Sequence, residues 1–106
     1  MALTPLQQDA TRLIDEIEAE MKRSGLWQNE PLKPEQLNFR KAFAMDTMAF
    51  SQWLQFIFVP RVHEAIAANR FPSSSSVGGQ AVREFDTVPN ASRLTTLLSE
   101  FDALFR

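Results

Sequence analysis

The sequence predicts an all-α fold: a compact bundle of about four helices, three long and one short, around a central apolar helix kinked by a proline. Apolar residues recur at helical spacing in three long segments. One of them, roughly 50–70, is apolar on nearly all sides, which is typical of a buried helix. No segment alternates apolar and polar residues as a half-buried strand does. A chain of 106 residues has the size of a single domain, residues 1–106.

The first helix is predicted between Thr4 and Gly25. Thr4 suits the N-cap, and Pro5 suits the first helical position, where a missing N–H costs nothing. Gly25 suits a left-handed C-cap, after which Leu26 and Trp27 are expected to fold back on the helix end. One face of this helix carries its apolar residues, which are Leu6, Ala10, Leu13, Ile14, Ile17 and Met21.

Residues 28–45 are expected to form an irregular connection, because Pro31 and Pro34 disfavour helix at the residues before them. Its apolar content predicts that it packs across the bundle, with one helical turn at 34–36.

The central helix is predicted to begin near Asp46 or Thr47, which are both good capping residues, and to run to about Asn69. Its first half carries a stripe of Phe50, Trp53, Leu54 and Ile57. Pro60 should kink the helix, and the stripe then continues, rotated, through Val59, Val62, Ala65 and Ile66.

Two further helices are predicted after a serine-rich loop at 71–80. Ala81, Val82 and Phe85 indicate a short helix that ends near Asp86. The last helix should start at Pro89 and Asn90, with Asn90 as its N-cap. Its apolar face consists of Leu94, Leu97, Leu98, Phe101, Leu104 and Phe105.

The composition argues against most enzyme classes. The chain has no cysteine and a single histidine, His63, so we expect no zinc site and no bound cofactor. No serine lies in a Gly-x-Ser-x-Gly turn, and no phosphate-binding loop is present. We therefore assign no catalytic residue and no metal ligand, and expect a protein that is not an enzyme.

Charge and hydropathy predict a cytoplasmic protein. The net charge of -2 lacks the basic excess of generic nucleic-acid binders, although residues 36–70 contain more Lys and Arg than Asp and Glu. The N-terminal residues do not read as a secretory signal. The apolar run at 56–60 is too short to span a membrane.

The segment around residues 45–61 is the best candidate for an interaction surface, because exposed aromatic, Met and Arg residues are typical anchors at protein interfaces. Phe56, Phe58 and Arg61 fall off the regular stripe and are the candidates for exposure. Asp46, Arg40 and Lys41 complete the candidate surface. The leading hypothesis is a non-enzymatic module that binds another protein, and homo-oligomerisation stays open.

The alternative hypothesis is an RNA-binding accessory protein. Arg40, Lys41, Arg61 and Arg70 would contact phosphates. Phe39 or Trp27 would offer a surface for base stacking.

Four stretches resemble the YqcC-like family of small bacterial proteins: Leu26-Trp27, Phe43-Ala44-Met45-Asp46-Thr47-Met48, Trp53-Leu54-Gln55-Phe56-Ile57-Phe58-Val59-Pro60-Arg61 and Asp102-Ala103-Leu104-Phe105. The resemblance covers nearly the whole chain and is weakest at the serines 73–76. It implies an all-helical bundle in a Gram-negative bacterial cytoplasm, and no particular activity. Genes of this family often lie beside a tRNA pseudouridine synthase gene. The resemblance therefore implies an accessory subunit of an RNA-modifying enzyme.

Overall fold

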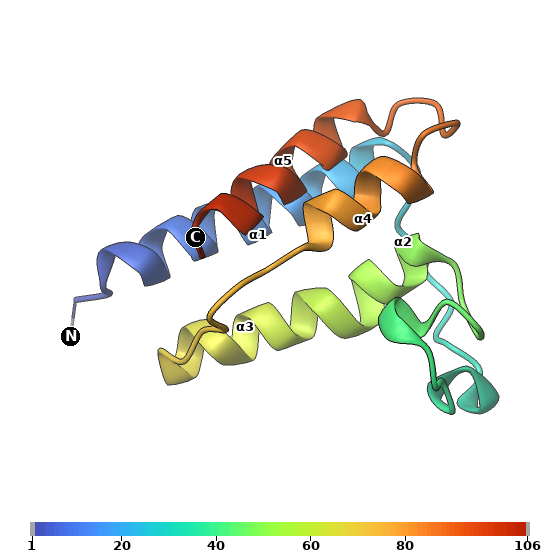
Figure 1. Ribbon diagram of the computed structural model, residues 1–106, viewed down its shortest axis with the longest axis horizontal. Coiled ribbons are helices and arrows are strands. Elements are labelled where there is room, and N and C mark those ends of the chain that lie inside the picture. Colours follow the sequence, from blue (N-terminus) through green and yellow to red (C-terminus); the bar gives the residue numbers. More distant parts are fainter. Residues whose placement is uncertain (1, 106) are drawn as a thin grey trace.

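The computed structural model describes residues 2–105, and every regular element in that range is helical (Figure 1). The elements are α1 (Pro5–Arg23), η1 (Pro34–Leu37), η2 (Ala42–Ala44), α2 (Phe50–Trp53), η3 (Leu54–Phe58), α3 (Val59–Ala68), α4 (Val77–Glu84) and α5 (Ser92–Ala103). The segments η1 and η2 are 3-10 turns, whereas α2, η3 and α3 follow one another without a gap as one long helix. The predicted all-α bundle with three long helices and one short helix is confirmed.

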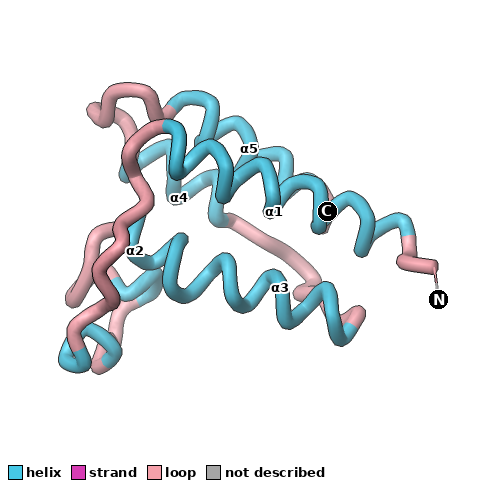
Figure 2. Tube along the Cα trace, turned by 180° about the vertical axis from the view of Figure 1, so that it is seen from behind, coloured by secondary structure: helices cyan, strands magenta, loops and turns pink. Residues whose placement is uncertain are grey.

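The long helix 50–68 lies at one side of the bundle, not at its centre as the sequence suggested. The helix α5 packs against both α1 and α4, and α3 packs on α1 (Figures 1 and 2). Pro60, Arg61 and Glu64 are exposed on the outer face of the long helix. The apolar composition of the long helix thus predicted more burial than the structure shows, because several of its apolar residues are only half-buried. Within residues 2–105, no helix combines the length and the apolar character that crossing a bilayer requires.

The predicted ends of α1 are confirmed. The N–H of Gln7 donates to Thr4 Oγ1 at 3.1 Å, and the N–H of Thr4 donates to the Gln7 side chain at 2.8 Å, which closes a capping box. Gly25 takes a φ of 79°, and the N–H of Leu26 then reaches the carbonyl of Met21 at 2.8 Å. The apolar face of α1 is buried from Ala10 to Met21.

The long helix begins at Phe50, later than predicted. The side chains of Asp46 and Thr47 are committed elsewhere: Asp46 accepts from Arg40 and Lys41, and Thr47 donates to the carbonyl of Gln36. The N–H of Ala49 is satisfied instead by the side chain of Gln52, at 2.9 Å.

The irregular turn of this helix lies one turn earlier than the predicted kink at Pro60. Residues 54–58 form a π turn, and the N–H of Val59 donates to the carbonyl of Leu54, five residues back. The wider turn places Leu54 and Val59 on the same buried face, and Phe58 is buried where the stripe had predicted Ile57.

Both C-terminal helices start at residues other than those predicted. The helix α4 starts at Val77, within the expected loop, because the carboxylate of Asp102 caps its first turn. Asn90 takes a left-handed φ of 63° and does not cap a helix; α5 starts at Ser92. The predicted apolar face of α5 is confirmed, with Leu94, Leu97 and Leu98 fully buried.

Candidate functional site

Residues 34–47, here called the double-turn loop, project at one end of the bundle (Figure 1). It contains η1 and η2, which are drawn in teal and green in Figure 1. Thr47 Oγ1 donates to the carbonyl of Gln36 at 2.7 Å, and the Gln36 side chain donates to the carbonyl of Thr47 at 3.3 Å. These reciprocal bonds hold η1 against the end of the loop.

Asp46 closes the second half of the double-turn loop. Its carboxylate accepts the backbone N–H of Arg40 at 3.0 Å and that of Lys41 at 3.3 Å. The hydrogen bond from Arg40 is the main cause that holds the pKa of Asp46 below its ordinary value. The loop it closes contains two consecutive left-handed residues, Phe43 at φ 57° and Ala44 at φ 52°. Such residues are uncommon and persist where the surroundings hold them.

The exposed side chains of the double-turn loop include two large apolar residues and two basic residues, beside the acidic Glu35 and Asp46. Leu37 is 57% exposed and Met45 is 54% exposed. Arg40 and Lys41 are also exposed, and neither takes part in an ion pair among residues 2–105. Three predicted site residues, Arg40, Lys41 and Asp46, thus come together here, although Asp46 uses its carboxylate to fix the backbone.

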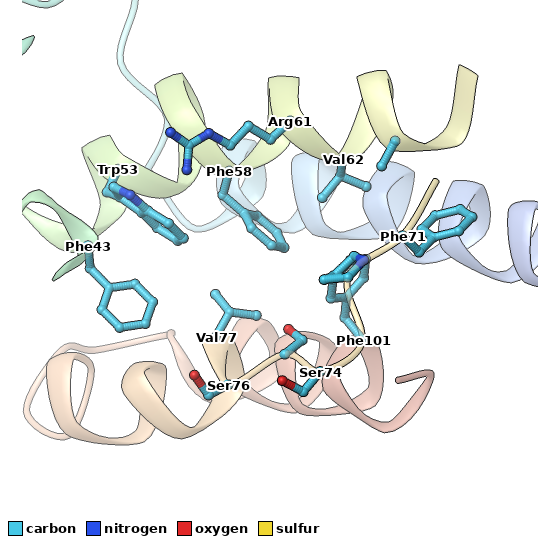
Figure 3. A pocket seen from close by; sticks show the side chains of 13 residues that line it. Phe43, Trp53, Phe58, Arg61, Val62, Phe71, Ser74, Ser76, Val77 and Phe101 are labelled. Atoms are coloured by element: carbon cyan, nitrogen blue, oxygen red, sulfur yellow. The ribbon is translucent and has the colours of Figure 1, made fainter. Parts of the chain in front are cut away.

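A pocket of about 410 Å³ opens between the long helix, the 69–76 loop and the C-terminal helices (Figure 3). The long helix and the double-turn loop provide Phe43, Trp53, Phe58, Arg61, Val62 and Ala65, and the other side provides residues 71, 72, 74–77 and 101. Figure 3 shows the rings of Phe43, Trp53 and Phe58 on one side of the space, and Val77, Ser76 and Phe101 on the other.

Aromatic rings form a continuous wall of this pocket. The ring centroids of Phe43 and Trp53 lie 4.9 Å apart, and those of Trp53 and Phe58 lie 5.6 Å apart. Phe58 then contacts Phe101 of α5 edge to face, at 5.2 Å. The wall therefore joins the double-turn loop to the last helix through side-chain packing.

The pocket includes two of the predicted candidates in different roles. Arg61 is exposed and lines the pocket. Phe58 also lines it, but this side chain is only 8% exposed, so the expectation of an exposed anchor is wrong for Phe58. The π turn explains the difference, because it rotates Phe58 into the core face. Phe56 is half-buried and does not line the pocket.

Sequence reasoning missed Phe43, Phe71 and Phe101 as pocket residues. Phe43 and Phe71 lie outside the long helices. An aromatic residue in a connection between helices was the available signal that these two side chains pack against the bundle. Phe101 belongs to the predicted apolar face of α5 and is buried, and its contribution to a pocket depends on a helix pairing that periodicity does not specify.

His63 lies away from the pocket. Its Nε2 pairs with Glu18 Oε1 of α1 at 2.8 Å, and it is not among the pocket residues. The pocket lining contains no Asp or Glu side chain. In the part of the chain that the structure describes, no group of three or more His, Cys, Asp or Glu residues is placed to hold a metal ion. The pocket therefore offers apolar contact, the serines 74–76 and one cation, not an acid–base pair.

A family model decides the relationship of this chain to known proteins. The model DUF446, which carries the description "tRNA pseudouridine synthase C", matches residues 9–104. The chain belongs to this family. Its similarity to the "Uncharacterized protein YqcC" of Escherichia coli K12, 30% identity over 92% of both chains, confirms the YqcC-like resemblance. An "Uncharacterized protein" of Haemophilus influenzae is 26% identical over 69% of this DUF446 chain and 73% of its own length.

A third relative is a larger protein. The "tRNA pseudouridine synthase C" of Pectobacterium carotovorum is 40% identical to this chain over 48 residues, which are 45% of this chain but only 13% of that protein. Most of that synthase therefore has no counterpart in this DUF446 chain. No solved structure matches the chain.

Proposed function

We propose that the protein is a non-enzymatic cytoplasmic accessory module that binds a tRNA pseudouridine synthase through the double-turn loop. One observation carries the choice of surface: Leu37 and Met45 are both more than half exposed on a backbone that is fixed by side-chain hydrogen bonds. Exposed apolar side chains that gather in one region mark protein interfaces. A fixed loop also loses little conformational entropy on binding, so more of the contact energy appears as affinity.

The similarity to a synthase supports the choice of partner. A stretch related to this chain forms 13% of the "tRNA pseudouridine synthase C" of Pectobacterium carotovorum. The description of the DUF446 family carries the same words. A sequence that occurs within a synthase in one organism is a reasonable partner of a synthase in another, which is an argument from association.

A matched pair of variants tests the surface. Leu37→Ser combined with Met45→Ser removes both exposed apolar side chains of the loop, whereas Val82→Ser removes one of similar exposure, 58%, from α4. Isothermal titration of the synthase from the same genome should detect binding by the wild-type chain and by Val82→Ser, and weaker binding by the loop variant. If the wild-type chain does not bind, the proposed function is wrong. If the wild-type chain and both variants bind equally, the double-turn loop is not the binding surface.

RNA binding is the second candidate function, and a different observation favours it. Arg40, Lys41 and Arg61 are exposed and make no ion pair among the described residues. If they contact phosphates, affinity for tRNA must fall steeply with salt and must fall less steeply in an Arg40→Gln/Lys41→Gln variant. A flat salt response would remove this candidate.

A further inference from the structure

We propose that the aromatic pocket is a binding site for a small organic anion whose body is an apolar ring system. The proposal does not depend on a synthase partner or on the exposed Leu37 and Met45 side chains of the double-turn loop, although Phe43 of that loop lines the pocket. The pocket is open on one side and has a volume of about 410 Å³. This volume lies within the range of about 300–1,000 Å³ that is usual for small-molecule sites, which are mostly apolar with a few polar groups that fix orientation.

The aromatic wall selects an apolar ring. Phe43, Trp53 and Phe58 contact one another in series, with Phe43 edge-on to Trp53 and Trp53 stacked on Phe58. A planar ring can stack or meet edge to face against such a surface. Against this wall, a ring with many polar edges, such as a nucleobase, would leave N–H and C=O groups facing carbon, and that costs binding energy. The serines 74–76 line the opposite side of the pocket, where they can meet a polar substituent.

The single charge of the lining selects an anion. Arg61 is the only charged residue that lines the pocket, and its guanidinium takes part in no ion pair among residues 2–105. The nearby carboxylate of Asp102 is already occupied by the Ser75 hydroxyl and by the backbone N–H groups of Val77 and Gly78. The guanidinium is thus free to hold a carboxylate or sulfonate.

Two probes that differ in one group separate the contribution of the ring to binding from that of the negative charge. The first is 8-anilino-1-naphthalenesulfonate, and the second is N-phenyl-1-naphthylamine, which has the same ring system without the sulfonate. The chain contains two tryptophans, so two indole N–H resonances report the place of binding. We expect saturable binding of both probes with a shift of the Trp53 resonance, while Trp27, which does not line the pocket, stays in place. A shift of the Trp27 resonance alone, or binding without saturation, would show that the probes do not bind in this pocket.

A variant of Arg61 tests whether this residue binds the anionic group. Arg61→Gln should lower the affinity for the sulfonate about tenfold, because a charge-assisted hydrogen bond is lost, and should leave the affinity for the neutral probe unchanged. Lys33→Gln, another exposed cation outside the pocket, should change neither affinity. Equal effects of Arg61→Gln on both probes, or no effect on either, would overturn the role of Arg61.

Filling the pocket tests the ring site itself. Ala65 is half-buried and lines the pocket, so Ala65→Phe should abolish binding of both probes while the helical circular dichroism stays that of the wild type. If this variant does not fold, Ser74→Trp on the exposed loop serves the same purpose. Retained binding in the folded blocking variant would overturn the proposal. Uridine monophosphate should bind far more weakly than the sulfonate probe, and equal binding would overturn the choice of an apolar ring.

Discussion

Asp102, close to the end of α5, accepts a hydrogen bond from the backbone N–H of Gly78 at 2.8 Å and so caps the first turn of α4. The same carboxylate accepts the N–H of Val77 at 3.0 Å and the hydroxyl of Ser75. Asp102 is buried, and these partners satisfy it. One side chain therefore fixes the start of α4 and one end of the loop that borders the pocket.

Asp102→Ala should lower the free energy of unfolding by about 2 kcal/mol, because it removes a charged cap and leaves two buried N–H groups unpaired. Urea denaturation followed by circular dichroism measures the change. Glu100→Ala, on the exposed side of the same helix, should change stability by less than about 0.5 kcal/mol. Equal stability of the two variants would contradict the capping role.

The adjacent residues Gly78 and Gly79 should respond to alanine in opposite directions. A Cβ at Gly78 would lie 2.6 Å from the Cα and N atoms of Ser99, so Gly78→Ala must push α4 and α5 apart. We expect a loss of about 2 kcal/mol. A Cβ at Gly79 meets nothing within 4 Å, so Gly79→Ala should raise stability by about 0.5–1 kcal/mol through helix propensity. Thermal melts of both variants check this pair, and a stable Gly78→Ala would show that the helices are not in close contact.

Phe58→Ala should cost about 3–5 kcal/mol, because the ring is buried between Trp53 and Phe101. Phe56→Ala, at a half-buried position, should cost about 1 kcal/mol. Chemical denaturation of both variants measures the difference. Similar losses would mean that Phe56 belongs to the core as much as Phe58 does.

Gln55→Leu should lower stability by about 2 kcal/mol. The buried Gln55 amide accepts the N–H of Gln28 at 2.9 Å and donates to the carbonyl of Gln28 at 2.8 Å, so the substitution leaves both backbone groups unpaired. Hydrogen exchange of the Gln28 amide should quicken. Gln8→Leu, at an exposed position, is the control. Unchanged exchange at Gln28 would contradict this link between the 28–33 connection and η3.

The double-turn loop should loosen in acid through Asp46. Its pKa in the folded protein lies below the ordinary value, mainly because the N–H of Arg40 binds the charged carboxylate. Its contribution to stability is therefore complete above the unfolded pKa of about 4 and is lost as the pH falls through the lower folded pKa. The difference in urea midpoint between the wild-type chain and Asp46→Asn should be constant near neutral pH and shrink in that acidic window. A difference that does not depend on pH would contradict this role.

Elements with local signals could be predicted from the sequence. The ends of α1 are set by Thr4, Pro5 and Gly25, through contacts within a few residues. The apolar residues of α1 and α5 recur at helical spacing. The double-turn loop shows where local signals fail. Asp46 and Thr47 are good caps in isolation, but in the fold they bond to Arg40, Lys41 and Gln36, and no local pattern distinguishes the two uses.

The start of α4 was missed because its cap is not local. Ser75, Gly78 and Gly79 read as a loop, yet Asp102, more than twenty residues later, supplies the acceptor that lets the helix begin at Val77. The candidate site was predicted in part for the same reason. Arg40, Lys41 and Arg61 lie on the surface as their charge indicates, but a pocket that joins Phe43 to Phe101 depends on how distant segments pack.

The π turn at 54–58 makes the register of the long helix depend on one extra residue. Deleting a residue there would restore ordinary α geometry and would rotate everything before it by about 100° relative to α3. Phe50 and Trp53 would then lose their ring contacts with Phe43. Amino-acid exchanges within this turn are therefore easier for such a chain to accept than any change in its length, and alignments of relatives should place no gap between Leu54 and Phe58.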